Sequence, residues 1–276
     1  MILAMARNIP QAHQSLKAGE WNRKAFRGTE LYKKTLGIIG AGPIGLGVAK
    51  RAQSFGMQIL AFDPYLTEDK AKSLDIQLAT VDEIASKSDF VTVHTPLTPK
   101  TKGIVGENFF KKAKPNLQII NVARGGIIDE DALINALDHA QISRAAIDVF
   151  EHEPPLDSPL IKHDKIIVTP HLGASTVEAQ EKVAVSVSNE IIDILTKGTV
   201  EHAVNAPKMD MNEVDQNVKD YLSLATTIGE FGIQLLEGAP SEVTITYGGD
   251  VAKIDTSLIS RTIVSNILKE DFGDEV

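Results

Sequence analysis

The sequence predicts an α/β fold built on a doubly wound parallel sheet, with a partial second domain at the C-terminus. Six short apolar runs, typical of strands buried on both faces, are separated for the most part by helix-like segments. They lie at Leu36–Gly40, Met57–Phe62, Phe90–His94, Leu117–Val122, Ala145–Val149 and Ile166–Thr169. Strands that alternate with helices form parallel sheets covered on both faces, so this part of the chain is predicted to be a Rossmann-type domain.

Polar stretches between the runs supply the helices. Gln11–Trp21 is predicted as a polar helix ahead of the first strand, and a basic loop follows it. Asp129-Glu130-Asp131 marks the start of another helix, because acidic residues are favourable at the positive end of a helix dipole. Thr176–Lys197 is predicted as one long helix that ends at Gly198.

The C-terminal region has a different pattern. A linker over Ala203–Asn212 contains Pro207 and leads to a helix-like segment, a strand-like alternation over Glu242–Tyr247 and a second helix-like segment over Thr256–Glu270. The first of these helices is indicated by apolar residues at helical spacing, namely Val214, Val218, Tyr221, Ala225, Ile228 and Leu235. We therefore predict a partial second α/β domain here.

Charge divides the chain at the same place. Residues 209–276 contain 4 Lys or Arg and 13 Asp or Glu, which accounts for the whole net charge of −9, whereas residues 1–208 contain 24 of each. The predicted organisation is a sheet domain over residues 1–175, a helix and linker over 176–208 and an acidic domain over 209–276. A neutral body with an acidic tail excludes nucleic acid as a partner, since that would need a basic face.

Composition narrows the class further. The 276 residues include no cysteine, which excludes disulfides, thiolate nucleophiles and cysteine-ligated metals and favours a cytoplasmic protein. No apolar run approaches the ~20 residues that cross a bilayer. No basic segment precedes the short apolar start MILAM, so we predict neither a membrane span nor a signal peptide. No metal site is predicted.

The turn after the first strand carries the most informative motif. Gly40-x-Gly42-x-x-Gly45 follows an apolar run and opens a helix-like stretch. Gly40 permits the tight turn, Gly42 lets the backbone approach a pyrophosphate, and Gly45 lets the helix pack closely on the strand. The pyrophosphate would lie at a helix N-terminus, where free N–H groups favour an anion. The motif therefore predicts dinucleotide binding.

Asp63 indicates which dinucleotide is bound. It ends the second strand, 21 residues after Gly42, close to the ~20-residue offset of a ribose-binding acid. A carboxylate there accepts hydrogen bonds from the ribose hydroxyls and repels a 2′-phosphate. The next residues, Pro64, Tyr65 and Leu66, include no cation that would neutralise such a phosphate. The predicted cofactor is NAD rather than NADP.

Substrate-binding residues are expected at the carboxyl ends of the strands, where ligands of such sheets bind. Arg124 follows the fourth run in a Gly-rich loop, where it can present a planar fork to a carboxylate, although its position fits a surface arginine equally well. His171 follows the sixth run, and a histidine suits acid/base chemistry because its ordinary pKa is near 6.5. His94 ends the third run and is expected only to line the cofactor path.

Four separated motifs carry a family resemblance. GAGPIG, NVARGGIIDEDAL, DVFEHEPP and TPHLGAST together resemble the D-2-hydroxyacid dehydrogenase family, from about residue 11 to residue 207. The resemblance implies a catalytic Arg, Glu and His and a set of cofactor contacts. The catalytic residues fall on Arg124, Glu153 and His171, and the further cofactor contacts fall on Pro43, Ile44, Val122, Ala123 and Asp148, the last as the acid that contacts the nicotinamide.

The implied reaction is hydride transfer at C2 of a 2-hydroxy acid. His171 takes the hydroxyl proton, Glu153 holds the imidazole and stabilises its protonated form, and Arg124 binds the substrate carboxylate and carbonyl oxygen. General acid/base help of this kind is worth about 10²–10⁴-fold in rate. The hydride chemistry itself belongs to the nicotinamide.

The resemblance also implies a longer protein. Family members begin with a substrate lobe of roughly a hundred residues, so residue 1 is expected in the helix that enters the cofactor domain. Long members with an extra domain act on a phosphorylated 2-hydroxy acid, which is the expected small-molecule substrate, and a homo-oligomer is expected. Without the lobe, Thr176–Lys197 is expected to expose an apolar stripe.

Two other functions stay open at this point. One is another dehydrogenase of the family, such as a hydroxypyruvate reductase. The other is an NAD-binding scaffold or sensor without turnover. The joint presence of Arg124, Glu153 and His171 favours an enzyme.

Overall fold

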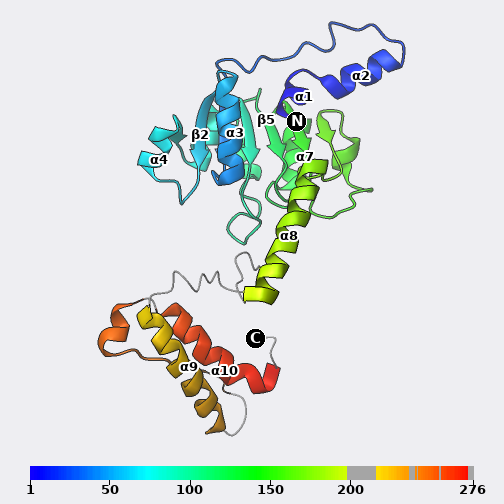
Figure 1. The fold of residues 1–276 in the computed structure, drawn as a ribbon. Helices are drawn as coiled ribbons and strands as arrows, with labels where there is room; N and C mark the ends of the chain where they lie inside the picture. The colour runs from blue at the N-terminus through cyan, green and yellow to red at the C-terminus, as the bar shows by residue number, and fades with distance from the viewer. Residues whose placement is uncertain (198–215, 236–239, 241, 255, 273–276) are drawn as a thin grey trace. The chain divides into compact units, whose positions relative to one another are not determined.

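The computed structural model describes residues 1–197, 216–235, 240, 242–254 and 256–272 (Figure 1). The chain divides into two compact units, Met1–Gln180 and Glu181–Val276. Each unit is described by itself below. The predicted linker over 203–212, and the predicted helix end at Gly198, lie outside the described residues.

Seven parallel strands form a single sheet in the first unit, in the order β3-β2-β1-β4-β5-β6-β7. The strands are β1 (Thr35–Ile39), β2 (Gln58–Phe62), β3 (Gln77–Leu78), β4 (Phe90–Val93), β5 (Gln118–Asn121), β6 (Arg144–Ile147) and β7 (Ile166–Val168). Six of them confirm the predicted runs. The strand order reverses between β1 and β4, and ligands bind at such a switch point, outside the carboxyl ends of the strands.

Helices connect the strands. They are α1 (Ile2–Ala6), α2 (Ile9–Lys17), α3 (Pro43–Ser54), α4 (Glu68–Ser73), α5 (Val81–Lys87), α6 (Glu107–Lys112), α7 (Glu130–Asp138) and the 3-10 turn η1 (Pro159–Lys162). The helix predicted over Gln11–Trp21 begins earlier and ends at Lys17. Asn8 adopts a left-handed backbone (φ 56°) that separates α2 from α1. Asp129 caps α7 by accepting a hydrogen bond from the Ala132 N–H at 2.9 Å, which confirms the helix start predicted there.

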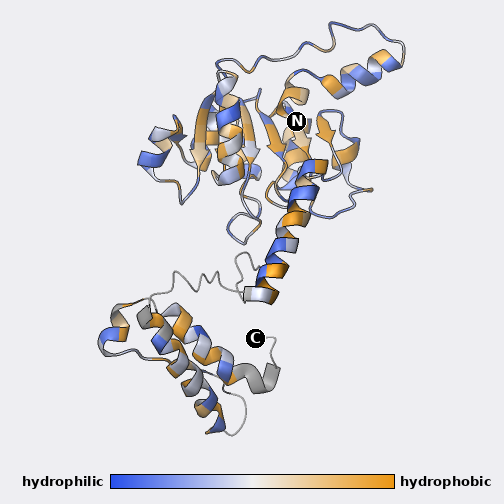
Figure 2. Ribbon diagram, in the orientation of Figure 1, coloured by the Kyte–Doolittle hydropathy of each residue, from blue (hydrophilic) through white to orange (hydrophobic). Residues whose placement is uncertain are grey.

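Two apolar cores, one on each face of the sheet, make the fold doubly wound. Neighbouring residues of a strand point to opposite faces, so Ile38 belongs to one core and Ile39 to the other. The Ile39 face packs on α5, α6 and α7, and the Ile38 face packs on α1, α3 and α4. Figure 2 shows the strands between them as predominantly hydrophobic ribbons. The continuous apolar runs of the sequence thus reflect burial on both faces.

The long helix α8 (Val177–Lys197) confirms the prediction over Thr176–Lys197. It carries an exposed apolar stripe at helical spacing, formed by Val183, Val187, Ile191 and Ile194. None of the helices in the described ranges has the length and apolar character needed to cross a membrane.

The second unit is helical where it is described. Its elements are α9 (Gln216–Gln234), η2 (Gly249–Lys253) and α10 (Ser257–Phe272). The helices α9 and α10 enclose a small core of Val218, Ala225, Ile259, Ile263 and Ile267. Gly229 of α9 permits close packing, because a Cβ there would lie 2.6 Å from the Ile263 carbonyl oxygen.

The strand predicted over Glu242–Tyr247 is not formed among the described residues. Its alternation has another cause. Ile245 and Tyr247 pack against the helical core while Thr246 is exposed, and the Tyr247 hydroxyl lies 2.7 Å from Ser260 Oγ on α10. The segment therefore covers a helix pair with alternate side chains, without pairing to a strand within the described ranges.

Candidate active site

The glycine loop after β1 has the geometry of a pyrophosphate cradle. Gly40 has a positive φ of 96°, and a Cβ there would lie 2.7 Å from the His94 carbonyl carbon, so the turn packs on the segment that follows β4. A Cβ at Gly45 would lie 2.2 Å from the Gly40 carbonyl oxygen, which explains how α3 packs onto the turn. A Cβ at Gly42 would meet nothing within 4 Å. Open space beside the Gly42 backbone is what the approach of a phosphate needs, so the loop fits a dinucleotide.

Asp63 joins the glycine loop to the end of β2. Its Oδ2 accepts a hydrogen bond from the Ala41 N–H at 2.7 Å, and its Oδ1 accepts one from the Tyr65 N–H at 2.8 Å. A carboxylate oxygen has about two acceptor sites, so each oxygen keeps capacity for a ribose hydroxyl. The half-buried position of Asp63 leaves it reachable by such a ligand.

A cavity of about 690 Å³ opens beside these loops, within the usual size of a ligand site. Of the residues predicted for the site, it is lined by Ile44, Val122, Arg124 and His171. The remaining predicted residues lie in the loops around it, and they are Gly40, Gly42, Pro43, Gly45, Asp63, Ala123, Asp148 and Glu153. Pro43 is the first residue of α3, where its missing N–H costs no helical hydrogen bond.

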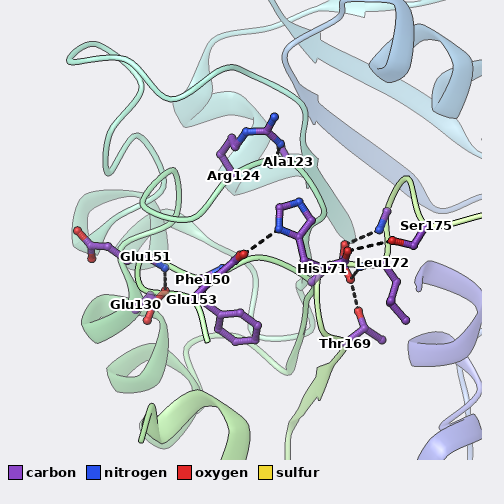
Figure 3. Close-up of polar contacts among 12 residues, drawn as sticks. Ala123, Arg124, Glu130, Phe150, Glu151, Glu153, Thr169, His171, Leu172 and Ser175 are labelled. Atoms are coloured by element: carbon purple, nitrogen blue, oxygen red, sulfur yellow. Dashed lines mark hydrogen bonds and ion pairs between the residues drawn. The ribbon is translucent and has the colours of Figure 1, made fainter. Parts of the chain in front are cut away.

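Glu153 and His171 form an ion-pair geometry across two loops (Figure 3). His171 Nδ1 lies 2.8 Å from Glu153 Oε2, and Glu153 Oε1 accepts a hydrogen bond from the Phe150 N–H at 3.0 Å. The hydrogen bond from His171 lowers the pKa of Glu153, and the Phe150 N–H adds to this. An ionised carboxylate at Nδ1 favours the tautomer with its proton there, so Nε2 is left as the acceptor. The sequence brought these residues together only through the family resemblance.

The loop that carries Arg124 is fixed by Asn121, which the sequence analysis missed. Asn121 is buried at the end of β5, where its Nδ2 donates to the Arg124 carbonyl oxygen at 2.9 Å and its Oδ1 accepts from the Ala123 N–H at 3.0 Å. Gly125 brings this loop against the Glu153 loop, because a Cβ there would lie 1.9 Å from the Phe150 carbonyl oxygen. A buried amide at the end of an apolar run was the available signal.

The Arg124 side chain is exposed and lines the cavity. Its Nη1 donates to the Ala123 carbonyl oxygen at 2.7 Å, which leaves other guanidinium N–H groups for a ligand. A planar fork of this kind suits a carboxylate. The cavity therefore has a cation and an imidazole on its wall.

His94 also lines the cavity, beside Thr92. His94 Nε2 lies 3.0 Å from Thr92 Oγ1, and burial lowers the pKa of His94. A neutral imidazole here adds no cation to the wall near neutral pH. Thr92 was missed, although a polar residue inside the run FVTVH indicated it.

His171 holds an unusual backbone conformation. Its φ of 53° lies in the left-handed region, which costs a residue with a side chain on the order of 1–3 kcal/mol. The His171 N–H donates to the carbonyl oxygens of Asp148 at 2.8 Å and Thr169 at 3.0 Å. Asp148 is buried and is not among the residues that line the 690 Å³ cavity, so its predicted contact with the nicotinamide stays a prediction. Among the described residues, no group of three or more His, Cys, Asp or Glu could hold a metal ion.

Fold and site together define a Rossmann-type dinucleotide-binding domain with an acid/base pair at the carboxyl ends of its strands. Comparison with protein families agrees. Residues 1–173 match the D-isomer specific 2-hydroxyacid dehydrogenase, NAD binding domain, and residues 217–276 match the D-3-phosphoglycerate dehydrogenase intervening domain. The chain belongs to the D-isomer specific 2-hydroxyacid dehydrogenase family, and its sheet domain is of the type that binds NAD, as predicted.

Curated relatives carry one name. The chain is 46% identical over 269 residues to D-3-phosphoglycerate dehydrogenase of Bacillus subtilis (strain 168), covering 98% of this chain and 51% of the relative. The relative of that name in Methanocaldococcus jannaschii is also 46% identical over 269 residues, covering 97% of this chain and 51% of the relative. The human relative is 40% identical over 271 residues, covering 98% and 50%. The chain thus spans about half the length of the curated relatives it matches.

Solved structures support the same fold. A glyoxylate reductase from Paecilomyes thermophila superposes with a TM-score of 0.68 at 32% identity, covering 74% of this chain and 62% of that chain. A D-2-hydroxyisocaproate dehydrogenase gives a TM-score of 0.69 at 26% identity, covering 74% and 66%. These similarities fall on proteins that share the 2-hydroxyacid or 2-oxoacid theme in their names.

Proposed function

We propose that the protein is an NAD-dependent oxidoreductase that converts 3-phospho-D-glycerate to 3-phosphooxypyruvate, the first step of L-serine synthesis. The observation that carries the proposal is the His171–Glu153 pair at 2.8 Å, whose imidazole shares a cavity wall with the Arg124 side chain. A proton acceptor and a cation for a carboxylate are what a 2-hydroxy acid requires.

The residues divide the chemistry between them. Arg124 binds the substrate carboxylate and orients the C2 oxygen. His171 Nε2 accepts the proton of the C2 hydroxyl, while Glu153 stabilises the positive charge that develops on the ring. In the reverse direction Nε2 returns that proton. NAD, when bound, supplies the hydride acceptor.

The cofactor is held by the loops that follow β1, β2 and β5. Gly40, Gly42 and Gly45 shape the pyrophosphate cradle, Asp63 accepts from the adenosine ribose, and the other contacts are Pro43, Ile44, Val122, Ala123 and Asp148. The open space beside Gly42 supports this assignment. So does the acceptor capacity that remains on Asp63.

The substrate is assigned from the company of the domain. The match of residues 217–276 to an intervening domain, and relatives named D-3-phosphoglycerate dehydrogenase, favour phosphoglycerate over an unphosphorylated acid. On the same ground we propose a sheet domain over 1–175, a helix and linker over 176–208 and an intervening-type domain over 209–276. A cytoplasmic homo-oligomer completes the proposal.

The test is NADH formation by the protein of the complete reading frame, with 3-phosphoglycerate and with unphosphorylated glycerate compared at equal concentration. We expect turnover with the first acid and His171→Ala to lower kcat by about 10²–10⁴-fold with NADH affinity nearly unchanged. The same replacement at exposed His139, on the C-terminal cap of α7, is the matched control.

The outcomes separate the competing functions. Turnover of hydroxypyruvate with NADH, and none of phosphoglycerate, would assign a hydroxypyruvate reductase instead. NADH binding without turnover of any 2-hydroxy or 2-oxo acid would assign a scaffold or sensor. Equal loss of turnover and NADH affinity in His171→Ala would contradict the role given to this residue.

A further inference from the structure

Asp148 anchors the loop that carries His171. It follows β6, and only 1% of its surface is exposed. Its Oδ1 accepts hydrogen bonds from the Thr169 hydroxyl and from the Leu172 N–H at 2.8 Å, and its Oδ2 accepts one from the Gly173 N–H at 2.8 Å. The carboxylate is thus bonded on both sides of His171 in the sequence, and its backbone carbonyl bonds the His171 N–H itself.

The loop needs such an anchor. His171 has a left-handed backbone (φ 53°), which a residue with a side chain keeps only when its surroundings over-determine it. Thr169 and Leu172 flank the histidine in Figure 3, which also shows the imidazole directed toward Glu153. If the backbone at residue 171 relaxed, the ring would turn away from Glu153, because the Cα–Cβ direction follows the backbone dihedrals.

Asp148 has little capacity left for a ligand of its own. A carboxylate offers about four acceptor sites, and three are used by the loop. Gly173 leaves no room for a shift, since a Cβ there would lie 2.8 Å from Val122 Cγ1 and 3.2 Å from Asp148 Oδ2. His171 and Gly173 line the cavity, whereas Asp148 is not among its lining residues.

We propose that Asp148 is a positioning residue: its carboxylate fixes the left-handed backbone at His171, so that Nδ1 meets Glu153 and Nε2 faces the cavity. This deepens the proposed function and rests on it for the role of Nε2. It differs from a direct contact with the nicotinamide, because Asp148 then acts on turnover through the histidine and not on cofactor affinity.

The experiment compares Asp148→Asn with Asp164→Asn, the same replacement at an exposed aspartate. The Asn amide group would face an N–H, so part of the loop anchorage is lost at constant volume. In Asp148→Asn we expect loss of the downfield NMR signal of the His171 Nδ1 proton bonded to Glu153. We also expect kcat to fall at least about tenfold while the Kd of NADH changes less than about threefold. Asp164→Asn should change none of these.

Thr169 provides a second variant, in case Asp148→Asn does not fold. Thr169→Val removes only the hydroxyl donor to Asp148 and keeps the shape. It should weaken the Nδ1 signal and lower kcat by a smaller factor, and Thr169→Ser, which restores the hydroxyl, should recover both.

Two results would overturn the proposal. One is a Kd of NADH raised tenfold or more in Asp148→Asn with the Nδ1 signal and the kcat at saturating NADH unchanged, which would make Asp148 a cofactor contact. The other is a Thr169→Val protein whose signal and kcat equal those of the wild type. The NMR measurement needs no substrate, so it decides the proposal even if the wild type does not turn over phosphoglycerate.

Discussion

Glu153 and His171 meet across two loops, with 2.8 Å between Oε2 and Nδ1, and each is held from behind by the backbone. The Phe150 N–H fixes the second oxygen of Glu153, and the carbonyl oxygens of Asp148 and Thr169 fix the His171 N–H. The acid/base pair is therefore oriented by the fold itself. Preorganisation of this kind lets the ring charge be stabilised without rearrangement.

Glu153→Gln should lower kcat roughly tenfold, because a neutral amide still bonds Nδ1 but stabilises the imidazolium less than a carboxylate does. Steady-state NADH formation measures the change. Glu151→Gln is the matched control, since Glu151 lies two residues away and pairs with Lys102 at the surface. An equal effect of both replacements would show that the pair with His171 has no special part in turnover.

Acid should remove the stabilising contribution of Glu153. The hydrogen bond from His171, followed by that from the Phe150 N–H, lowers the pKa of Glu153 below its ordinary value of 4.5. A lowered pKa in the folded state stabilises the fold above pH 4.5, and this contribution is lost as the pH falls through the lowered pKa. The difference in Tm between the wild type and Glu153→Gln should therefore shrink on acidification. A difference that grew in acid would contradict the assignment.

Asp63→Ala should weaken NAD binding by roughly tenfold or more and narrow the preference for NAD over NADP. The replacement removes the acceptor for the ribose hydroxyls and the charge that repels a 2′-phosphate. It also leaves the Ala41 and Tyr65 N–H groups without their acceptor. Kd values for both reduced cofactors measure the effect, with Asp69→Ala on exposed α4 as control. An unchanged ratio of the two Kd values would remove the basis for assigning NAD to Asp63.

Gly42→Ala and Gly45→Ala should fail in different ways. A methyl group at Gly42 enters open space, so the fold should persist while NADH affinity falls at least about tenfold. A methyl group at Gly45 would lie 2.2 Å from the Gly40 carbonyl oxygen and should destabilise the whole sheet domain. Thermal unfolding and NADH fluorescence together separate the two effects. Full cofactor affinity in Gly42→Ala would place the pyrophosphate elsewhere.

Gly229→Ala should loosen the second unit, whereas Gly232→Ala in the same helix should tighten it. A Cβ at Gly229 would lie 2.6 Å from the Ile263 carbonyl oxygen, and overpacking of this kind typically costs about 1–3 kcal/mol. A Cβ at Gly232 would meet nothing within 4 Å, so the change should gain up to about 1 kcal/mol of helix propensity. Hydrogen exchange of the α9 and α10 amides reports both changes. Equal protection in the two variants would be inconsistent with close packing at Gly229.

Periodicity predicted the strands that are long enough to carry a pattern. Six apolar runs became strands, but β3 has only Gln77 and Leu78, and two residues make no run. The alternation over Glu242–Tyr247 was misleading, because a segment that lies along a helix pair also buries every second side chain. Pattern alone shows which side chains are covered and not what covers them.

The site was predicted less completely than the sheet. The glycines and Asp63 follow from a local motif with fixed spacing, but the meeting of Glu153 and His171 depends on two loops that are distant from each other in the chain. Spacing suggested only that strand ends converge, and the family resemblance supplied the pair. Asn121 and Thr169 were missed because they act on backbone or buried groups, and a sequence does not display hydrogen-bond partners.

The sheet ends on its two shortest strands, β3 with two residues and β7 with three. Short edges offer few unpaired N–H and C=O groups as a template for another chain, which protects a parallel sheet from amyloid-like growth. The apolar stripe of α8 has no such safeguard. When concentrated samples of this chain lose solubility, the colloidal behaviour should therefore respond to charged replacements on α8 and be indifferent to changes at the sheet edges.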